Sequence, residues 1–254
     1  GITVLGVTDH DTTSGWAEAI SAARKPISLA LGAEISTLTE DGISVHMLGL
    51  LFDGENSEIQ AMLSDARDTR IPRMKKMVEL LRSDGFAISM EDVIAATPEG
   101  ATLGRPHLAD ALVKNGVVKS RDEAFAELLT NDSKYYVTHA APTPEDAIRQ
   151  INQAGGVAVI AHPFASRRGE VISADTFTHL VSAGLHGIEV NHRDHSQAER
   201  EQLAQIADQL GLVKTGSSDY HGNGKLNELG ENLTDPEQWA RLESLASARR
   251  VVTK

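Results

Sequence analysis

The chain contains no cysteine, which excludes disulfide bonds, thiolate metal ligands and a cysteine nucleophile. It is also poor in positive charge, since 24 basic residues stand against 36 acidic ones and the net charge is −12. That balance gives no support for a general surface that binds the phosphate backbone of duplex nucleic acid. No apolar run approaches the roughly 20 residues that span a bilayer, and no signal peptide is visible. We therefore expect a cytoplasmic protein whose partners include neither a membrane nor duplex nucleic acid.

With 254 residues, of which 41% are hydrophobic, the chain is long enough for one sizeable core and a smaller appended unit. Short apolar runs alternate with amphipathic stretches, which is typical of repeated βα units. That rhythm stops between residues 56 and 134, where helical patterns follow one another without a convincing strand. The sequence thus predicts an α/β sheet or barrel from residues 1–66 and 139–254, with a mostly helical insertion domain at 67–138.

Several of the predicted strands end in ionisable residues. In βα folds the working residues lie at the carboxyl ends of the strands, so these side chains are expected to meet. Carboxylates and imidazoles are ligands of Zn²⁺, Mn²⁺ and Fe²⁺, and so many buried together would repel or desolvate one another without cations between them. The strand ends are Asp9 and His10, Glu34, His162, Asn191 and His192, and Asp219 and His221. His46 lies in a strand, residues 43–52, that is expected to form a hairpin with residues 35–39 through Asp41-Gly42.

Several of these residues also have a purely structural interpretation, and His162 with Pro163 could simply form a turn. Asp9 and Asp11 could cap the helix that follows them, and His10 could be a hydrogen-bonded core histidine. Glu34 could be a buried ion-pair partner, and His46 could face solvent. Asp219 and His221 are two residues apart, so on an extended backbone both side chains face the same way. Taken as a set, the residues favour a metal site.

The order and spacing of several motifs resemble the PHP (polymerase and histidinol phosphatase) family, in particular its small metal-dependent phosphoesterases with a helical insertion. These motifs are LGVTDHDTTSGW, GAEIS, VHMLGLLFD, AHP, GIEVNHRDH and SSDYHG, and GRPHLADALV in the insertion fits the same branch. The resemblance implies a distorted (β/α)7 TIM-like barrel with two to three divalent ions, Mn, Fe or Zn, at its C-terminal face. It implies that a metal-bridging hydroxide attacks the phosphorus. The metal ligands that it implies are Asp9, His10, Glu34, His46, His162, Asp219 and His221.

The chain departs from the family pattern at its start. The family begins with a strand that ends in His-x-His, a short way before the TDHD motif, and the sequence here begins after that point. We expect the first barrel strand and two metal ligands to be missing from these 254 residues, as if the sequence had been trimmed.

Other residues are candidates for binding the substrate. Arg105 opens a predicted helix, where backbone N–H groups also favour anions, although a surface arginine is an alternative. His192 could be a general acid or a phosphate contact, and Arg193 beside it a further phosphate contact, although it is expected to be more exposed. Further candidates with equally simple structural alternatives are Arg167 and Arg168 at the entrance, and Tyr135 and Tyr136, which could stack on a base.

The function that these features predict is a metal-dependent phosphoric ester hydrolase. The expected substrates are small nucleotides, such as nucleoside monophosphates like AMP, nucleoside bisphosphates or the 5′ ends of short RNA. One alternative is a metal-dependent amide or cyclic-urea hydrolase, but the lysine that often bridges the metals in those barrels has no counterpart at a strand end here. A second alternative is a non-catalytic nucleotide-binding domain.

Overall fold

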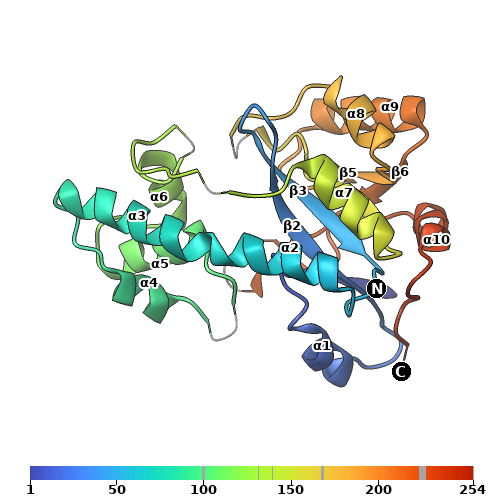
Figure 1. Ribbon diagram of the computed structural model, residues 1–254, viewed down its shortest axis with the longest axis horizontal. Helices are drawn as coiled ribbons and strands as arrows, with labels where there is room; N and C mark the ends of the chain where they lie inside the picture. The colour runs from blue at the N-terminus through green and yellow to red at the C-terminus, as the bar shows by residue number, and fades with distance from the viewer. Residues whose placement is uncertain (99–100, 131, 139, 167–168, 223–226, 254) are drawn as a thin grey trace. The chain divides into compact units, whose positions relative to one another are not determined.

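The computed structural model describes residues 1–98, 101–130, 132–138, 140–166, 169–222 and 227–253 (Figure 1). Its contacts divide the chain into two compact units. The sheet unit consists of Gly1–Leu63 and Pro142–Lys254, and the helical unit of Ser64–Ala141. Within the described ranges, no helix is both long enough and apolar enough to cross a membrane.

The sheet unit is built on a curled six-stranded sheet whose strands follow one another in chain order. β3 runs antiparallel to both β2 and β4, and the other neighbouring pairs are parallel. Five of the strands therefore point the same way, which brings their carboxyl ends to one edge and confirms the mixed α/β class. The strands are β1 (Val4–Val7), β2 (Ser28–Leu38), β3 (Ser44–Leu50), β4 (Val157–Ala161), β5 (Gly187–Asn191) and β6 (Val213–Gly216).

The hairpin is present and residues 35–38 pair with β3 as expected, but they form one continuous strand with the apolar run that was expected to end at Glu34. β2 does not end at Glu34: it continues to Leu38 and pairs in register from Gly32–Leu50 to Leu38–Ser44. The turn between the strands contains Gly42 at φ 86°, a left-handed conformation that glycine adopts without steric cost. Glu34 therefore lies in the middle of a strand, because its neighbours up to Leu38 gain backbone partners in β3.

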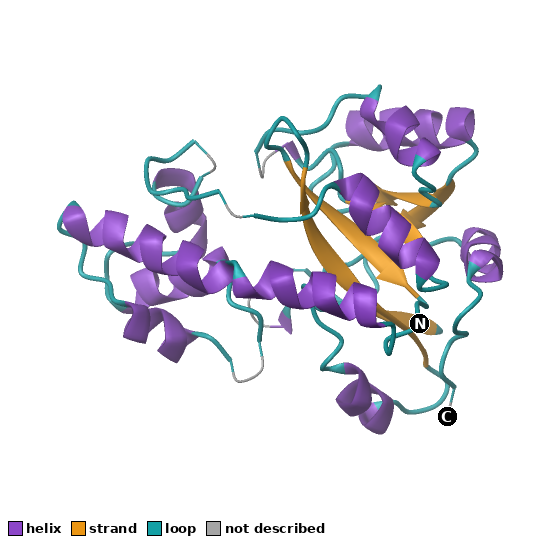
Figure 2. Cartoon of the chain, viewed as in Figure 1, coloured by secondary structure: helices purple, strands orange, loops and turns teal. Residues whose placement is uncertain are grey.

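Helices pack along the sheet and close its core (Figure 2). α7 begins at Pro144 because the Thr143 hydroxyl accepts from the Asp146 N–H and proline fits the first turn of a helix. Its buried face, with Ile148 and Ile151, packs against β2, β3 and β4. The helices of this unit are α1 (Trp16–Ala22), α7 (Pro144–Gln153), α8 (Thr176–Ser182), α9 (Gln197–Leu210) and α10 (Pro236–Leu245).

The helical unit has a hydrophobic core of its own, and no strand occurs among its described residues. Its helices are α3 (Arg70–Ser83), α4 (Met90–Ala96), α5 (Arg105–Lys114) and α6 (Arg121–Glu127), and α2 (Ser57–Asp68) crosses the division between the units. Pro72 stands in the first turn of α3, a position where proline is tolerated. The interpretation of residues 67–138 as a substrate cap stays a prediction.

Candidate metal centre

Five imidazoles and two carboxylates gather at the carboxyl edge of the sheet. The strand register explains how those of β1 to β4 meet. His10 follows β1 and forms an isolated parallel bridge with Glu34 of β2. His46 of β3 lies opposite Ser36 on one side and Ala161 on the other, so it stands beside His162, which follows β4. These four residues, which are far apart in the chain, thus become neighbours through backbone pairing.

Glu34 is the centre of the first group. Its Oε1 atom lies 2.6 Å from His46 Nδ1 and 3.1 Å from His162 Nε2, and its Oε2 atom lies 3.9 Å from His10 Nδ1. The donor atoms of His10, Glu34 and His46 all lie within 4.8 Å of one another, which is a spacing that could hold a metal ion. The register of β3 therefore places the His46 ring beside Glu34 rather than in solvent.

Asp219 is the centre of the second group. Its Oδ1 atom lies 3.3 Å from His221 Nδ1, and its Oδ2 atom lies 3.4 Å from His192 Nε2. The two groups adjoin, since the ring centroids of His10 and His221 are 6.0 Å apart and those of His162 and His192 are 5.2 Å apart.

The reason given by the sequence for the pairing of Asp219 with His221 is wrong. β6 ends at Gly216, and Asp219 has φ 46°, so the two residues do not lie on an extended backbone. They face each other because the loop turns back at Asp219, and the His221 ring also contacts the Asp219 carbonyl at 2.9 Å. Aspartate tolerates this left-handed conformation better than most residues.

The electrostatics of Glu34 favour a negative charge in a buried place. Burial by itself raises the pKa of this carboxyl, but the imidazoles of His10, His46 and His162 more than offset it and hold the pKa well below 4.5. The donor set of imidazoles and carboxylates suits a divalent transition metal. The residues present therefore fit the metal that the motifs imply.

Asp9 is not among the residues that gather. Its side chain is exposed, and its Oδ2 atom lies 2.8 Å from the position that a Cβ on Gly15 would occupy. Its carbonyl oxygen accepts the Glu34 N–H at 3.2 Å, so it fixes the loop through the backbone. A role for Asp9 as a metal ligand stays a prediction.

The helix-cap interpretation of Asp9 and Asp11 does not describe the structure, because α1 begins after Gly15 with no side-chain cap. Asp11 is instead fully buried at φ 54°, and its carboxylate accepts the Ser36 N–H at 2.7 Å and the Ser36 hydroxyl at 3.0 Å. This clamp ties the loop after β1 to β2 and places His10 beside Glu34.

Glu189 and His195 also lie at this edge, and neither is among the candidates that the sequence predicts. Glu189 of β5 is buried and its Oε2 atom accepts the His162 N–H at 2.8 Å, which supports His162 at its φ of 30°. Burial raises the pKa of Glu189 to about 7, with Asp219 adding to the rise and His192 opposing it. In the sequence, a glutamate inside the apolar run of β5 is the feature that indicates a buried carboxyl at position 189.

His195 is held by the backbone on both sides of its ring. Its Nδ1 donates to the Val190 carbonyl, and its Nε2 accepts the Phe164 N–H.

His192 is fully buried, and its tautomer follows from its contacts. Nδ1 accepts the Asp194 N–H at 3.1 Å, so in the neutral ring the proton is on Nε2. Nε2 is buried, makes no hydrogen bond and is directed toward Asp219. A proton-bearing nitrogen suits a hydrogen-bond or proton donor, and a metal ligand would need the opposite tautomer.

The candidate arginines have different surroundings. Arg193 is partly exposed and contacts Glu231 Oε1 and Asn227 Oδ1, each at 3.4 Å, so part of its charge is paired within the protein. Arg105 belongs to the helical unit, where it opens α5 and donates to the Leu129 carbonyl at 2.9 Å. Arg167 and Arg168 lie outside the described residues. Binding of phosphate by Arg105 and Arg193 stays a prediction.

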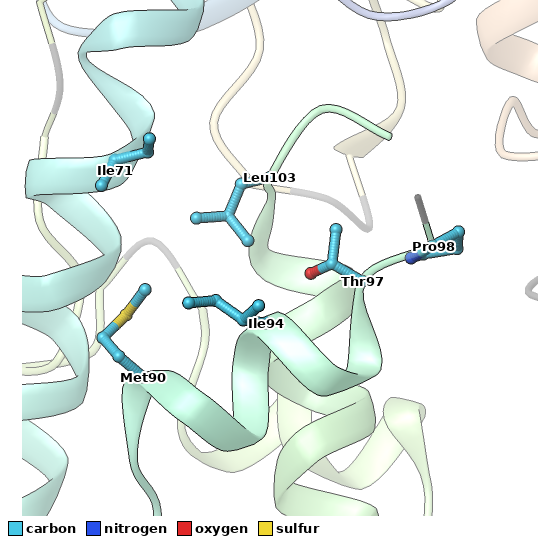
Figure 3. Close-up of a pocket in the computed structure, with 6 residues that line it drawn as sticks. All are labelled: Ile71, Met90, Ile94, Thr97, Pro98 and Leu103. Atoms are coloured by element: carbon cyan, nitrogen blue, oxygen red, sulfur yellow. The ribbon is translucent and has the colours of Figure 1, made fainter. Parts of the chain in front are cut away.

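The helical unit also contains an apolar pocket of about 320 Å³ (Figure 3). Hydrocarbon and thioether side chains line it apart from one threonine, so it offers no ligand set for a metal. Its lining residues are Ile71, Met90, Ile94, Thr97, Pro98 and Leu103.

The sheet edge with its shared carboxylate and converging imidazoles defines a metal-dependent hydrolase. No family model matches the chain. A 3′,5′-nucleoside bisphosphate phosphatase from Chromobacterium violaceum is 34% identical over 87% of this chain and 78% of its own length. A 5′-3′ exoribonuclease from Haemophilus influenzae is 31% identical over 92% of this chain and 84% of its own length.

A solved structure supports the same assignment. The crystal structure of a metal-dependent phosphoesterase from Bifidobacterium adolescentis superposes with a TM-score of 0.91 at 41% identity, covering 97% of this chain and 87% of its own. The chain belongs to the PHP family of metal-dependent phosphoesterases. It is therefore a hydrolase of phosphoric esters.

Proposed function

We propose that the protein hydrolyses phosphate esters of small nucleotides, namely nucleoside monophosphates such as AMP, nucleoside bisphosphates or the 5′ ends of short RNA. The observation that carries the proposal is the Glu34 carboxylate within 3.1 Å of both His46 and His162, at the strand edge that also carries Asp219. The names of the Chromobacterium and Haemophilus relatives support nucleotides as the substrate class.

The proposed cofactors are two to three divalent ions, Mn, Fe or Zn. The division of the donors into one group around Glu34 and another around Asp219 supports more than one ion. Divalent ions at such a site lower the pKa of bound water and neutralise charge on the attacking and leaving oxygens. The proposed ligands are His10, Glu34, His46, His162, Asp219 and His221, and Asp9 is retained as a candidate.

Side chains of the protein would donate a proton to the substrate and bind its phosphate. His192 carries its proton on Nε2 and could donate it to the leaving oxygen or to a phosphate oxygen. Its buried ring is held by the Asp194 N–H, and its carbonyl accepts from Arg200 Nη2 at 2.7 Å, so its orientation is prepared before substrate arrives. Arg105 and Arg193 would bind substrate phosphate, and residues 67–138 would act as the substrate cap of a distorted (β/α)7 barrel.

Turnover on a substrate panel tests this function. The complete chain is incubated with Mn²⁺, Fe²⁺ or Zn²⁺, and phosphate release is measured from AMP, a 3′,5′-bisphosphate and a 5′-phosphorylated oligoribonucleotide. Amide and cyclic-urea substrates form the second arm. We expect phosphate release that requires a metal and no hydrolysis of amides. Failure to hydrolyse any phosphoester with any of the metals would refute the proposal.

A further inference from the structure

The segments that follow β5 and β6 carry residues of both the phosphate contact and the metal centre, and the backbone pairs them only at their base. The Ser217 N–H donates to the Asn191 carbonyl at 3.0 Å. Beyond that bond, the segment after β5 continues into His192 and Arg193, and the segment after β6 turns back at Asp219. Among the described residues, no further backbone hydrogen bond joins the two segments. Their spacing therefore depends on side chains.

A buried asparagine, Asn227, contacts both segments. Only 8% of its surface is exposed. Its Nδ2 atom donates to the Ser218 carbonyl at 2.7 Å and to the Asp219 carbonyl at 3.3 Å. On the other side, its Oδ1 atom accepts from Arg193 Nη1 at 3.4 Å. One amide group thus spans the distance between the metal-binding turn and the arginine that follows β5.

The partners of Asn227 fix the orientation of its amide. Carbonyl oxygens accept hydrogen bonds and a guanidinium group donates them, so the amide nitrogen faces Ser218 and Asp219 and the amide oxygen faces Arg193. The opposite orientation would set oxygen against oxygen on one side and N–H against N–H on the other. A carboxylate of the same size could serve the arginine but has no donor for the carbonyls.

The Asp219 carbonyl is shared between Asn227 and His221. His221 Nδ1 lies 2.9 Å from this oxygen, and because a carbonyl can only accept, Nδ1 carries the proton and Nε2 of the neutral ring keeps its lone pair. Histidines that bind metals commonly donate their other N–H in this way, which fixes the ring. Asn227 therefore holds the carbonyl that in turn holds the His221 ring.

The turn that Asn227 contacts needs support from its surroundings. Asp219 has φ 46°, and residues other than glycine keep such a conformation only where neighbouring groups impose it. The Ser217 hydroxyl accepts the Asp219 N–H at 3.0 Å. Asn227 binds the carbonyl of the same residue, so the peptide groups on both sides of Asp219 are held.

We infer that Asn227 is a positioning residue, which holds the turn from Asp219 to His221 in the geometry of a metal site and sets its distance from Arg193. The inference rests on the proposed function, since it takes Asp219 and His221 as metal ligands and Arg193 as a phosphate contact. It adds a residue that aligns the metal ligands with the phosphate contact through its amide alone. Groups that orient metal ligands typically contribute about 10- to 100-fold to metal affinity.

Mn²⁺ binding by the metal-free protein tests this alignment. The complete chain is treated with EDTA and titrated calorimetrically with Mn²⁺ at a temperature where thermal unfolding shows each variant to be folded. Asn227→Leu removes the donors and the acceptor at similar size, and it should weaken Mn²⁺ binding about 10- to 100-fold. Asn152→Leu is the matched control, because Asn152 Nδ2 donates to the Gly184 carbonyl at 3.1 Å, on the amino side of β5. The control loses the same kind of hydrogen bond and should bind Mn²⁺ like the unchanged protein.

Hydrogen–deuterium exchange adds a measurement that needs no metal. In the metal-free protein, peptides that cover residues 217–222 should exchange faster in Asn227→Leu than in Asn152→Leu, since the turn has lost its support. If Asn227→Leu does not fold, Asn227→Ala carries both measurements, because the smaller side chain cannot overpack the site.

A purely structural asparagine would give a different result. The thermal stability of the Asn227 variant would fall, while its Mn²⁺ affinity stayed within about threefold of that of Asn152→Leu. That result overturns the inference, as does unchanged exchange of residues 217–222 or a failure of the unchanged protein to bind Mn²⁺.

The two proposals fail separately. A protein that releases phosphate with metals but binds Mn²⁺ independently of Asn227 refutes the positioning role alone. A protein whose Mn²⁺ affinity depends on Asn227 yet which hydrolyses no phosphoester refutes the proposed function alone.

Discussion

Replacement of Glu34 by glutamine removes one negative charge from the centre of the imidazole cluster and leaves the size of the side chain almost unchanged. Glu34 is only 6% exposed and contacts His46 and His162 directly, with His10 at 3.9 Å. If this carboxylate holds divalent ions, its loss should appear chiefly as a loss of metal affinity. If it is only a buried ion-pair partner, the loss should appear chiefly as a loss of stability.

The magnitude follows from the charge that is removed. A pair of unit charges about 4 Å apart interacts with about 4 kcal/mol at an effective dielectric constant of about 20. Each 1.4 kcal/mol corresponds to about a tenfold change in affinity, so about three orders of magnitude are at stake. The glutamine oxygen remains a weak ligand, and we therefore expect Mn²⁺ to bind Glu34→Gln about 100- to 1,000-fold more weakly.

Calorimetric titration of the metal-free protein with Mn²⁺ measures this directly. Glu40→Gln is the matched control, because Glu40 follows the same strand, is exposed and carries the same charge. Glu40→Gln should bind Mn²⁺ like the unchanged protein. The reasoning is refuted if Glu34→Gln retains Mn²⁺ affinity within about threefold of the control while its thermal stability falls.

Two further changes test this edge of the sheet, and a third tests a histidine at the opposite, amino end of β5. Asp219→Asn should abolish phosphate release and leave the unfolding temperature nearly unchanged, since asparagine tolerates φ 46°; global unfolding would mark Asp219 as structural. Asp11→Ala leaves the buried N–H and hydroxyl of Ser36 without their acceptor and should cost about 3 kcal/mol in urea denaturation, and a loss below about 0.5 kcal/mol would contradict the clamp. Burial lowers the pKa of His186, whose Nδ1 accepts the Ala158 N–H, so the unfolded chain binds the proton preferentially as pH falls below 6.5 and stability falls with it. His186→Asn keeps an acceptor but no titrating ring, and its stability should fall less over that range; parallel curves would contradict the assignment.

The strand ends and the hairpin could be predicted because they depend on local signals. Apolar runs that stop at polar residues indicate where buried strands leave the sheet, and Asp41-Gly42 indicates the turn between β2 and β3. The start of α7 at Thr143-Pro144 is equally local.

The position of Glu34 shows where local signals stop being sufficient. The apolar run ends there, but it continues without a break into the hairpin strand that pairs with β3, so Glu34 lies inside one strand rather than at its end. The pairing of Asp219 with His221 was expected from an extended backbone and arises instead from a left-handed turn. In both cases a contact distant in sequence decides the conformation of a short segment.

The sequence by itself determined the class of fold, the identity of the metal-ligand candidates and, through its motifs, the family. It could do so because residue type and strand periodicity already limit the chemistry that a strand edge can carry. Only the tertiary structure decided that Asp11 clamps Ser36, that Glu189 is buried with a pKa near 7, and that Asn227 contacts both Asp219 and Arg193. Desolvation and charge coupling depend on which distant groups surround a side chain, and no local pattern contains that information.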